Sequence, residues 1–246
     1  MAKSSGLGQN LYFAGVDLSN DVSAVSSVHG GNTPFVVTGL DKSAFERIGG
    51  LLDGGLHFEP YFNAAAAKAH PTLSPLPTTD IQIVYATGTS IGSPAAGIVA
   101  KQLNYDGTRG ADGSLAFAVA DPVNGYALEW GDLLTAGLRT DTGATSPATG
   151  LDGLATSTTG WCAYLQVTAF TGTSVTVTLQ DSADNAAFAG FTGSAFTAVT
   201  VAPGWQRIEG AAGATVRRYV RAITTGTFNP ATFAVMFCRH PTGATA

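Results

Sequence analysis

The chain has few charged residues, only two cysteines and no long apolar run. Of its 246 residues 12% are charged, which is well below the usual figure of about a quarter, while 45% are hydrophobic. A surface with so few charges favours association, so we expect the protein to work in an assembly. No segment reaches the roughly 18 apolar residues that a membrane span needs, and residues 11–16 are too short and too polar for a signal peptide. The sequence therefore predicts no membrane partner.

The few charges are unevenly distributed. Residues 1–150 carry 7 basic and 13 acidic side chains, a net charge of −6, whereas residues 151–246 carry 5 arginines, no lysine and 4 acidic side chains, a net charge of +1. Affinity for nucleic acid comes mainly from clustered Lys and Arg that contact phosphates. The acidic first part of the chain therefore argues against binding to a phosphate backbone.

The two cysteines, Cys162 and Cys238, set no cellular compartment. Both fall on predicted strands, the first and the last of the C-terminal part, where they could be neighbours in one sheet or could lie on opposite faces. Free buried cysteine is common, and two cysteines in a chain of this size define no disulfide framework. There is also no Asn-x-Ser/Thr acceptor site. We expect a protein made in a cytoplasm.

Alternation of side chains is the main pattern that is present. Valine and leucine alternate with threonine over residues 175–179, and phenylalanine and valine alternate with alanine and methionine over residues 233–237. Such a two-residue period predicts half-buried strands. The predicted strands, each bounded by turn-forming residues, are 10–18, 56–62, 81–86, 98–105, 115–119, 126–130, 161–170, 174–181, 194–200, 206–209, 215–224 and 231–238. The predicted fold class is therefore all-β with one short helix.

The helix and the loops suggest how the chain is organised. Asp41 can cap a helix over residues 42–48, which the pair Gly49-Gly50 would end. Residues 26–33 are rich in Ser and Gly, which predicts a loop or equally a flexible arm. Residues 140–159 lack apolar periodicity and have the composition of a linker.

We therefore divide the chain into three parts. The predicted parts are a first domain over 1–140, a linker over 141–159, and a C-terminal domain over 160–246. The number and spacing of the strands in the last part suit a β-sandwich or a jelly roll.

One motif would suit a serine hydrolase. Gly88-Thr89-Ser90-Ile91-Gly92 matches the nucleophile-elbow pattern, His29-Gly30-Gly31 resembles an oxyanion loop, and His240 follows downstream. The elbow needs a strand that leads into a long helix, however, whereas Ser93-Pro94 and another β pattern follow here. In a chain with 31 glycines, a Gly-rich turn is the better explanation.

No other group of residues has the spacing of a chemical site. The histidines have no partner at i+4 and no adjacent pair of cysteines, so they lack zinc-ligand spacing. Asp181, Asp184 and Asn185 lack the alternating order and the central Gly of a calcium loop. We therefore predict that the chain is not an enzyme and has no catalytic residue, no cofactor and no metal. Trp161 and Trp205 could stack on sugars, which leaves a carbohydrate-binding β-sandwich module as the alternative function.

Several segments resemble a known family. Residues 38–54, Thr-Gly-Leu-Asp-Lys-Ser-Ala-Phe-Glu-Arg-Ile-Gly-Gly-Leu-Leu-Asp-Gly, followed by Leu56, Phe58 and Phe62-Asn63, resemble the major tail proteins of long-tailed actinobacteriophages. Residues 104–115, 177–188 and 217–221 resemble later parts of the same family. The resemblance implies a tail-tube β-sandwich or barrel with a flanking helix in the first domain. Six copies would form a ring, and rings would stack into the tail tube that conducts the genome during ejection.

The resemblance also implies a location and partners. The chain would belong to the virion tail and would contact copies of itself and the tape-measure, tail-terminator and distal-tail proteins. DNA would pass through the lumen without specific binding, and the C-terminal domain would decorate the outside. The residues point the same way, because strand edges can be completed by copies of the chain and cyclic closure leaves no edge free. The candidate subunit contacts are Phe45, Ile48, Phe58 and Tyr61, which bracket the predicted helix and the Pro-interrupted strand, although packing in the core is an alternative role for at least two of them.

Overall fold

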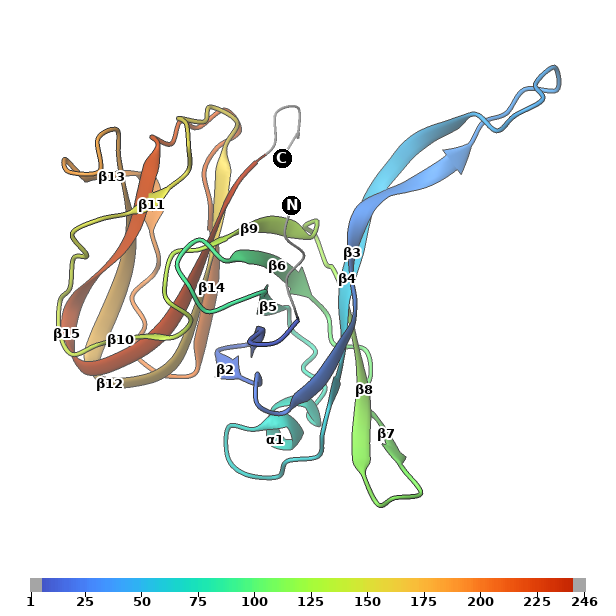
Figure 1. Cartoon of the computed structure of the whole chain (residues 1–246), viewed down its shortest axis with the longest axis horizontal. Helices are drawn as coiled ribbons and strands as arrows, with labels where there is room; N and C mark the ends of the chain where they lie inside the picture. Colours follow the sequence, from blue (N-terminus) through green and yellow to red (C-terminus); the bar gives the residue numbers. More distant parts are fainter. Residues whose placement is uncertain (1–5, 241–246) are drawn as a thin grey trace. The chain divides into compact units, whose positions relative to one another are not determined.

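The computed structural model describes residues 6–240, and within them β-strands predominate (Figure 1). This part of the chain contains fifteen strands and one helix of five residues. The predicted all-β class with one short helix is therefore confirmed. None of the helices in the described residues is long and apolar enough to cross a membrane.

The contacts group the chain into two compact units. The first unit contains residues up to 20, residues 82–97 and the chain from 129 onward, and the second contains residues 21–81 and 98–128. This grouping differs from the predicted division into 1–140, 141–159 and 160–246. The predicted linker shares the first unit with the strands on both sides of it, because its backbone bonds to the C-terminal strand at Thr145 and Ser157 and through residues 151–152.

The first unit contains one large antiparallel sheet. Its strands are β1 (Asn10–Phe13), β2 (Val16–Asp17), β5 (Ile81–Ala86), β6 (Pro94–Ala100), β9 (Glu129–Leu133), β10 (Arg139–Asp141), β11 (Leu151–Asp152), β12 (Trp161–Ser182), β13 (Ala189–Ala195), β14 (Gly204–Glu209) and β15 (Tyr219–Arg239). The strand order is β13-β12-β15-β9-β6-β5-β1-β2, and β10 and β11 pair with β15 while β14 pairs with β12.

The longest ladder joins β12 and β15. It runs from the pair Trp161 and Arg239 to the pair Ser182 and Tyr219, with irregular register between Val167 and Ser174. Two predicted strands therefore merge into β12 and two merge into β15. The turn residue Gly172 sits inside this irregular stretch with φ +141°, where a Cβ would come within 2.5 Å of the Phe228 backbone. Glycine here allows a bulge in place of the predicted turn.

The predicted alternation places one face of this ladder in the core. Val175, Val177 and Leu179 are buried, as are the alternating residues of β15. The second face of the ladder is also covered, because β6 lies close to Tyr164. A Cβ atom on Gly97 of β6 would come within 2.6 Å of the Tyr164 ring. For this reason Ala234 and Met236, predicted to face outward, are buried as well.

The second unit has a smaller sheet and the helix. Its elements are β3 (Val22–Val36), β4 (Arg47–Pro60), α1 (Ala69–Leu73), β7 (Asp106–Arg109) and β8 (Leu115–Pro122), with strand order β3-β4-β8-β7. Leu56, Phe58, Leu73 and Val119 are buried in its core.

Two local predictions in this unit are wrong. Residues 42–48 form no helix, because Val36 pairs with Arg47 and the intervening residues turn the chain at the end of a hairpin. Residues 26–33 form part of β3 and not a loop, because their backbone is bonded along β4. In both cases pairing between strands outweighs a local preference. The helix in the described residues is α1, which lies after β4 and outside the predicted range.

Candidate interaction surface

The most unusual feature of the second unit is the hairpin of β3 and β4. We call residues 22–60, which comprise the two strands and their connection, the arm. Figure 1 shows it as a long two-stranded ribbon that ends in an open loop. No residue of β3 is buried, and β4 is buried only from Gly54 toward its C-terminal end. The arm therefore has a base in the core and a distal part without one.

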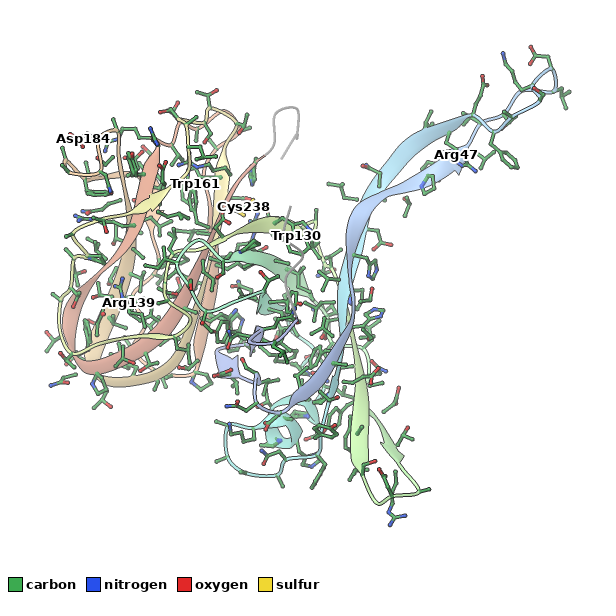
Figure 2. All side chains as sticks on the ribbon, in the orientation of Figure 1. Arg47, Trp130, Arg139, Trp161, Asp184 and Cys238 are labelled. Atoms are coloured by element: carbon green, nitrogen blue, oxygen red, sulfur yellow. The ribbon has the colours of Figure 1, made fainter. Side chains whose placement is uncertain are left out.

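Large apolar side chains are exposed along the distal part. They are Phe35, Val36, Val37, Leu40, Phe45, Ile48, Leu51 and Leu52. Figure 2 shows the side chains of this ribbon, with Arg47 labelled near its end, standing clear of the other strands of the unit. A contiguous exposed apolar patch in a soluble protein usually marks a surface that another molecule covers. An isolated two-stranded hairpin is also at best marginally stable in water.

Local contacts set the shape of the distal part. The Phe35 ring lies over Gly50, where a Cβ would come within 2.4 Å of it, so glycine is needed at this position. At the tip the Thr38 hydroxyl oxygen accepts a hydrogen bond from the Glu46 backbone at 3.0 Å, and the Arg47 guanidinium lies 5.1 Å from the centre of the Phe45 ring. These contacts order the backbone of the tip but leave its apolar side chains in water.

The edge of β3 carries features that oppose open-ended strand addition. β3 and β7 are the edge strands of this sheet. Three register irregularities interrupt β3, and Pro34 provides no backbone N–H. Bulges and proline protect edge strands against uncontrolled pairing. Contact through the apolar side chains is thus better suited to this strand than simple extension of the sheet.

The predicted contact residues fall in different environments. Phe45, Ile48 and Tyr61 are 70%, 55% and 52% exposed, whereas Phe58 is fully buried in the core of the unit. Phe58 is therefore unavailable as a surface contact. The sequence analysis did not identify Leu51 and Leu52 as surface contacts. Successive side chains of a strand point to opposite faces, so two adjacent leucines on one strand indicate that at least one of them is exposed.

The hydrolase motif does not form an elbow. Residues 87–93 are a turn that joins β5 to β6, so no helix follows Ser90. Trp161 is also unavailable for stacking on a sugar, because it is fully buried and packs against Phe191 and Phe237. Trp205 is only half-buried on β14.

A buried polar cluster lies in the first unit. Glu129 of β9 accepts two hydrogen bonds from Arg207, at 2.9 Å from Nε and 2.7 Å from Nη2, and one from the Tyr164 hydroxyl at 2.5 Å. Burial opposes ionisation of Glu129, but the hydrogen bonds and charge of Arg207 hold its pKa below the usual value. Burial raises the pKa of the neighbouring Cys162 thiol, so this thiol is protonated and is no nucleophile.

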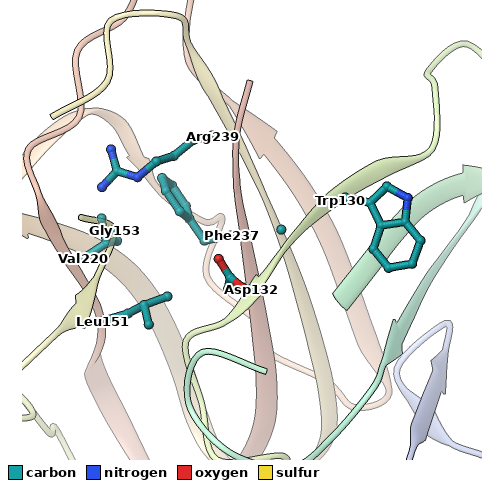
Figure 3. Close-up of a pocket in the computed structure, with 8 residues that line it drawn as sticks. Trp130, Asp132, Leu151, Gly153, Val220, Phe237 and Arg239 are labelled. Carbon is teal, nitrogen blue, oxygen red and sulfur yellow. The ribbon is translucent and has the colours of Figure 1, made fainter. Parts of the chain in front are cut away.

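A small cavity lies elsewhere in the first unit (Figure 3). It has a volume of about 160 Å³ and is lined by Trp130, Gly131, Asp132, Leu151, Gly153, Val220, Phe237 and Arg239. Trp130 is 52% exposed. Burial raises the pKa of Asp132 and lowers that of Arg239. The Arg239 guanidinium donates to Ser157 Oγ and to backbone carbonyls, including that of Val216 at 2.9 Å.

The comparisons with known proteins give weak likenesses only. No family model matches the chain, and no curated protein matches it either. Among solved structures, the chain is similar to the SPP1 Dit protein, described as a paradigm of the hub adsorption apparatus in phages that infect Gram-positive bacteria. The identity is 12%, the TM-score is 0.32, and the match covers 93% of this chain and 98% of that one.

It is also similar to a chain of the phage p2 baseplate in its activated conformation. Here the identity is 8%, the TM-score is 0.31, and the match covers 94% of this chain and 98% of that one. Likenesses at this level carry no argument about fold or function.

Proposed function

We propose that this chain is a structural protein of a phage tail that assembles with copies of itself through the arm. The observation that carries the proposal is the row of exposed apolar side chains on a hairpin with no core of its own. Covering these side chains in an assembly would stabilise both the arm and the contact, since burial of apolar area drives most protein association. The sequence resemblance to major tail proteins supports the same role.

In its finer form, the proposal is that six copies close into rings and that the rings stack into the tail tube. The first 140 residues would form the tube and residues 160–246 would decorate it. Phe45, Ile48 and Tyr61 would contribute to the contacts between copies, together with the other exposed apolar residues of the arm. Tape-measure, tail-terminator and distal-tail proteins would be its partners, and the tube would lie in the virion.

The test replaces Leu51 and Leu52, two adjacent exposed leucines of the arm. We expect the purified chain to form rings or tubes in negative-stain electron microscopy, and we expect Leu51→Asp with Leu52→Asp to remain monomeric in light scattering. Charges at these positions cannot be covered by an apolar surface without a large desolvation cost.

Leu154→Asp is the matched control, because Leu154 is 81% exposed in the other unit, close to the 82% of Leu51. It should assemble like the unchanged chain. A chain that stays monomeric under all conditions would refute self-assembly, and unaltered assembly of the double variant would exclude the arm as the contact.

The cavity beside Trp130 favours carbohydrate binding as a second candidate function. A partly exposed indole can stack on a sugar ring, and Asp132 and Arg239 can accept and donate hydrogen bonds to hydroxyl groups. We expect a glycan array probed with the chain to give signals that Trp130→Ala removes. No signal from the unchanged chain would eliminate this candidate.

A further inference from the structure

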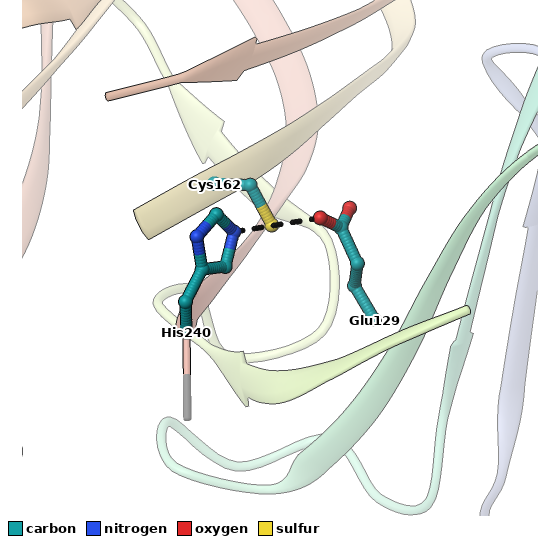
Figure 4. A group of neighbouring side chains, drawn as sticks. All are labelled: Glu129, Cys162 and His240. Atoms are coloured by element: carbon teal, nitrogen blue, oxygen red, sulfur yellow. Dashed lines mark ion pairs between the residues drawn. The ribbon is translucent and has the colours of Figure 1, made fainter. Parts of the chain in front are cut away.

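The buried polar cluster brings together three side chains that the sequence keeps far apart. Glu129 comes from β9, Cys162 from β12, and His240 follows the end of β15. One carboxylate oxygen, the thiol sulfur and one imidazole nitrogen all lie within 4.8 Å of one another (Figure 4). Figure 4 shows the three side chains, with a dashed line between the imidazole of His240 and the carboxylate of Glu129. The sequence spacing excluded a metal site at His240, but the sheet creates this convergence.

The strand register explains why the three groups meet. Cys162 is paired with Cys238 of β15 on one side and with Glu209 of β14 on the other. Paired residues on neighbouring strands point to the same face, so Cys162 and Cys238 share a face of the sheet. His240 lies two positions beyond Cys238, and its side chain therefore lies on that face as well. Its backbone is held by a hydrogen bond from His240 N to the Gly160 carbonyl at 3.2 Å and by the Thr159 hydroxyl, which donates to the His240 carbonyl at 2.5 Å.

The donor set suits a metal ion of the zinc class. Zinc is bound in proteins by thiolate, imidazole and carboxylate groups, and three such ligands leave a fourth position for water. Glu129 Oε1 lies 3.5 Å from His240 Nε2 and 2.7 Å from Arg207 Nη2, which leaves one of its lone pairs available.

The surroundings support the carboxylate as a ligand. Arg207 and Tyr164 hold the other lone pairs of Glu129, which fixes its orientation as outer groups do around metal ligands. The side chains of Glu129 and His240 are 12% and 11% exposed, so a bound ion would be largely shielded from water.

The net charge of the cluster is also compatible with binding of a cation. Arg207 pairs with the largely buried Glu129 and with Glu209, whose side chain is 44% exposed, at 2.7 Å in each case. The two carboxylates and the guanidinium together carry a net charge of −1. Binding of a divalent ion with loss of the Cys162 proton adds one positive charge, which brings this sum to zero, with Glu209 on the solvent-exposed side of the cluster.

We propose that Glu129, Cys162 and His240 form a binding site for a divalent metal ion of the zinc class. The ion takes the place of the thiol proton of Cys162, which passes to solvent, and it joins β9, β12 and the end of β15. No electron is transferred, because zinc is redox-inert. The site is structural, and it is independent of the assembly proposed for the arm.

The test uses the reduced full-length chain and Co²⁺ alone as the probe. Cobalt bound to a thiolate gives a charge-transfer absorption in the near ultraviolet. We expect one equivalent to bind with this band, and added Zn²⁺ to remove it by displacement. Cys162→Ser should abolish the band, and His240→Gln should weaken binding by about 10-fold to 100-fold.

Cys238→Ser is the matched control. Cys238 is the buried cross-strand neighbour of Cys162 but lies outside the proposed ligand set, so this variant should keep the band. Absence of the band in the unchanged chain would overturn the proposal, as would its persistence in Cys162→Ser or its loss in Cys238→Ser. If Cys162→Ser does not fold, as judged by circular dichroism, unchanged affinity in His240→Gln would overturn the proposal instead.

Discussion

A single buried carboxyl group has the largest consequence at the scale of the residue. Asp121 on β8 is fully buried, and neither of its carboxylate oxygens has a hydrogen-bond partner among the residues that the structure describes. Burial raises its pKa from 3.8 to about 8. A carboxyl group in such a place favours its neutral form, because an unpaired buried charge is costly.

This pKa predicts how stability depends on pH. Between pH 3.8 and about 8 the folded chain keeps a proton on Asp121 that the unfolded chain has lost. The contribution of Asp121 to the free energy of unfolding therefore falls as pH rises through this window, by up to about 1.4 kcal/mol per pH unit, and levels off above it. Asp121→Asn should gain stability relative to the unchanged chain as pH rises from 5 to 8, measured by urea unfolding.

The exposed Asp106 of the same unit supplies the control for this measurement. Asp106→Asn should follow the pH profile of the unchanged chain. Parallel profiles for Asp121→Asn and the unchanged chain would contradict the assignment of a neutral buried carboxyl group.

Among the elements, the segment predicted as a linker is held by backbone pairing with the C-terminal part of the chain and also by one buried hydroxyl group. The buried Thr224 of β15 donates to Asp141 Oδ2 at 2.7 Å and accepts from the Thr145 backbone at 3.1 Å. The composition of residues 140–159 gave no sign of this attachment. Hydrogen bonds from a distant strand have no local sequence signature. Here such bonds hold the segment against β15.

Removal of the hydroxyl group should release the segment locally. We expect Thr224→Val to lower the free energy of unfolding by about 0.5–1.5 kcal/mol, because Asp141 and the Thr145 amide each lose one hydrogen bond while Asp141 keeps its bond from Arg139 and the amide keeps its bond to the Thr224 carbonyl. Limited proteolysis should then cut within residues 142–149. The neighbouring Thr225 is exposed, so Thr225→Val changes the same atoms without this loss and should remain resistant. Equal resistance of the two variants would argue against an anchor at Thr224.

The sequence predicted some elements well and others poorly for identifiable reasons. β5 matches its predicted range of 81–86, because its alternation is clear and turn residues bound it on both sides. The arm was missed, because its Ser and Gly residues favour loops and its stability depends on a partner strand up to 38 residues away. The candidate contacts were chosen because they bracket the predicted helix and the Pro-interrupted strand, and the exposed Phe45 and Ile48 could not be distinguished from the buried Phe58 without the register.

At the scale of the whole molecule, the excess of acidic over basic side chains affects how an assembly would interact with nucleic acid. The chain has 17 acidic and 12 basic side chains. If copies close into a tube that conducts DNA, repulsion between this surface and phosphates would prevent adhesion. We expect assembled chain to retain no double-stranded DNA in an electrophoretic mobility assay at physiological salt.

A charge-reversed variant tests the same idea. Asp106→Lys with Asp112→Lys, both exposed and outside the arm, should leave assembly intact and produce salt-dependent DNA retention. Retention of DNA by the unchanged assembly would contradict a lumen that does not bind DNA. Absence of retention in the reversed variant would show that these positions do not face the DNA.

The interleaved order of the two units has a consequence for synthesis on the ribosome. Gln166 of β12 accepts a hydrogen bond from the Gly15 amide at 2.6 Å and donates one to the Gln82 carbonyl at 3.1 Å. The Gly15 amide can therefore make this hydrogen bond only after residue 166 has been translated, whereas the second unit is completely translated by residue 128. The arm can thus emerge and fold while its neighbours in the nascent chain are still unpaired. Apolar side chains that are exposed this early in synthesis favour binding of the nascent chain by chaperones.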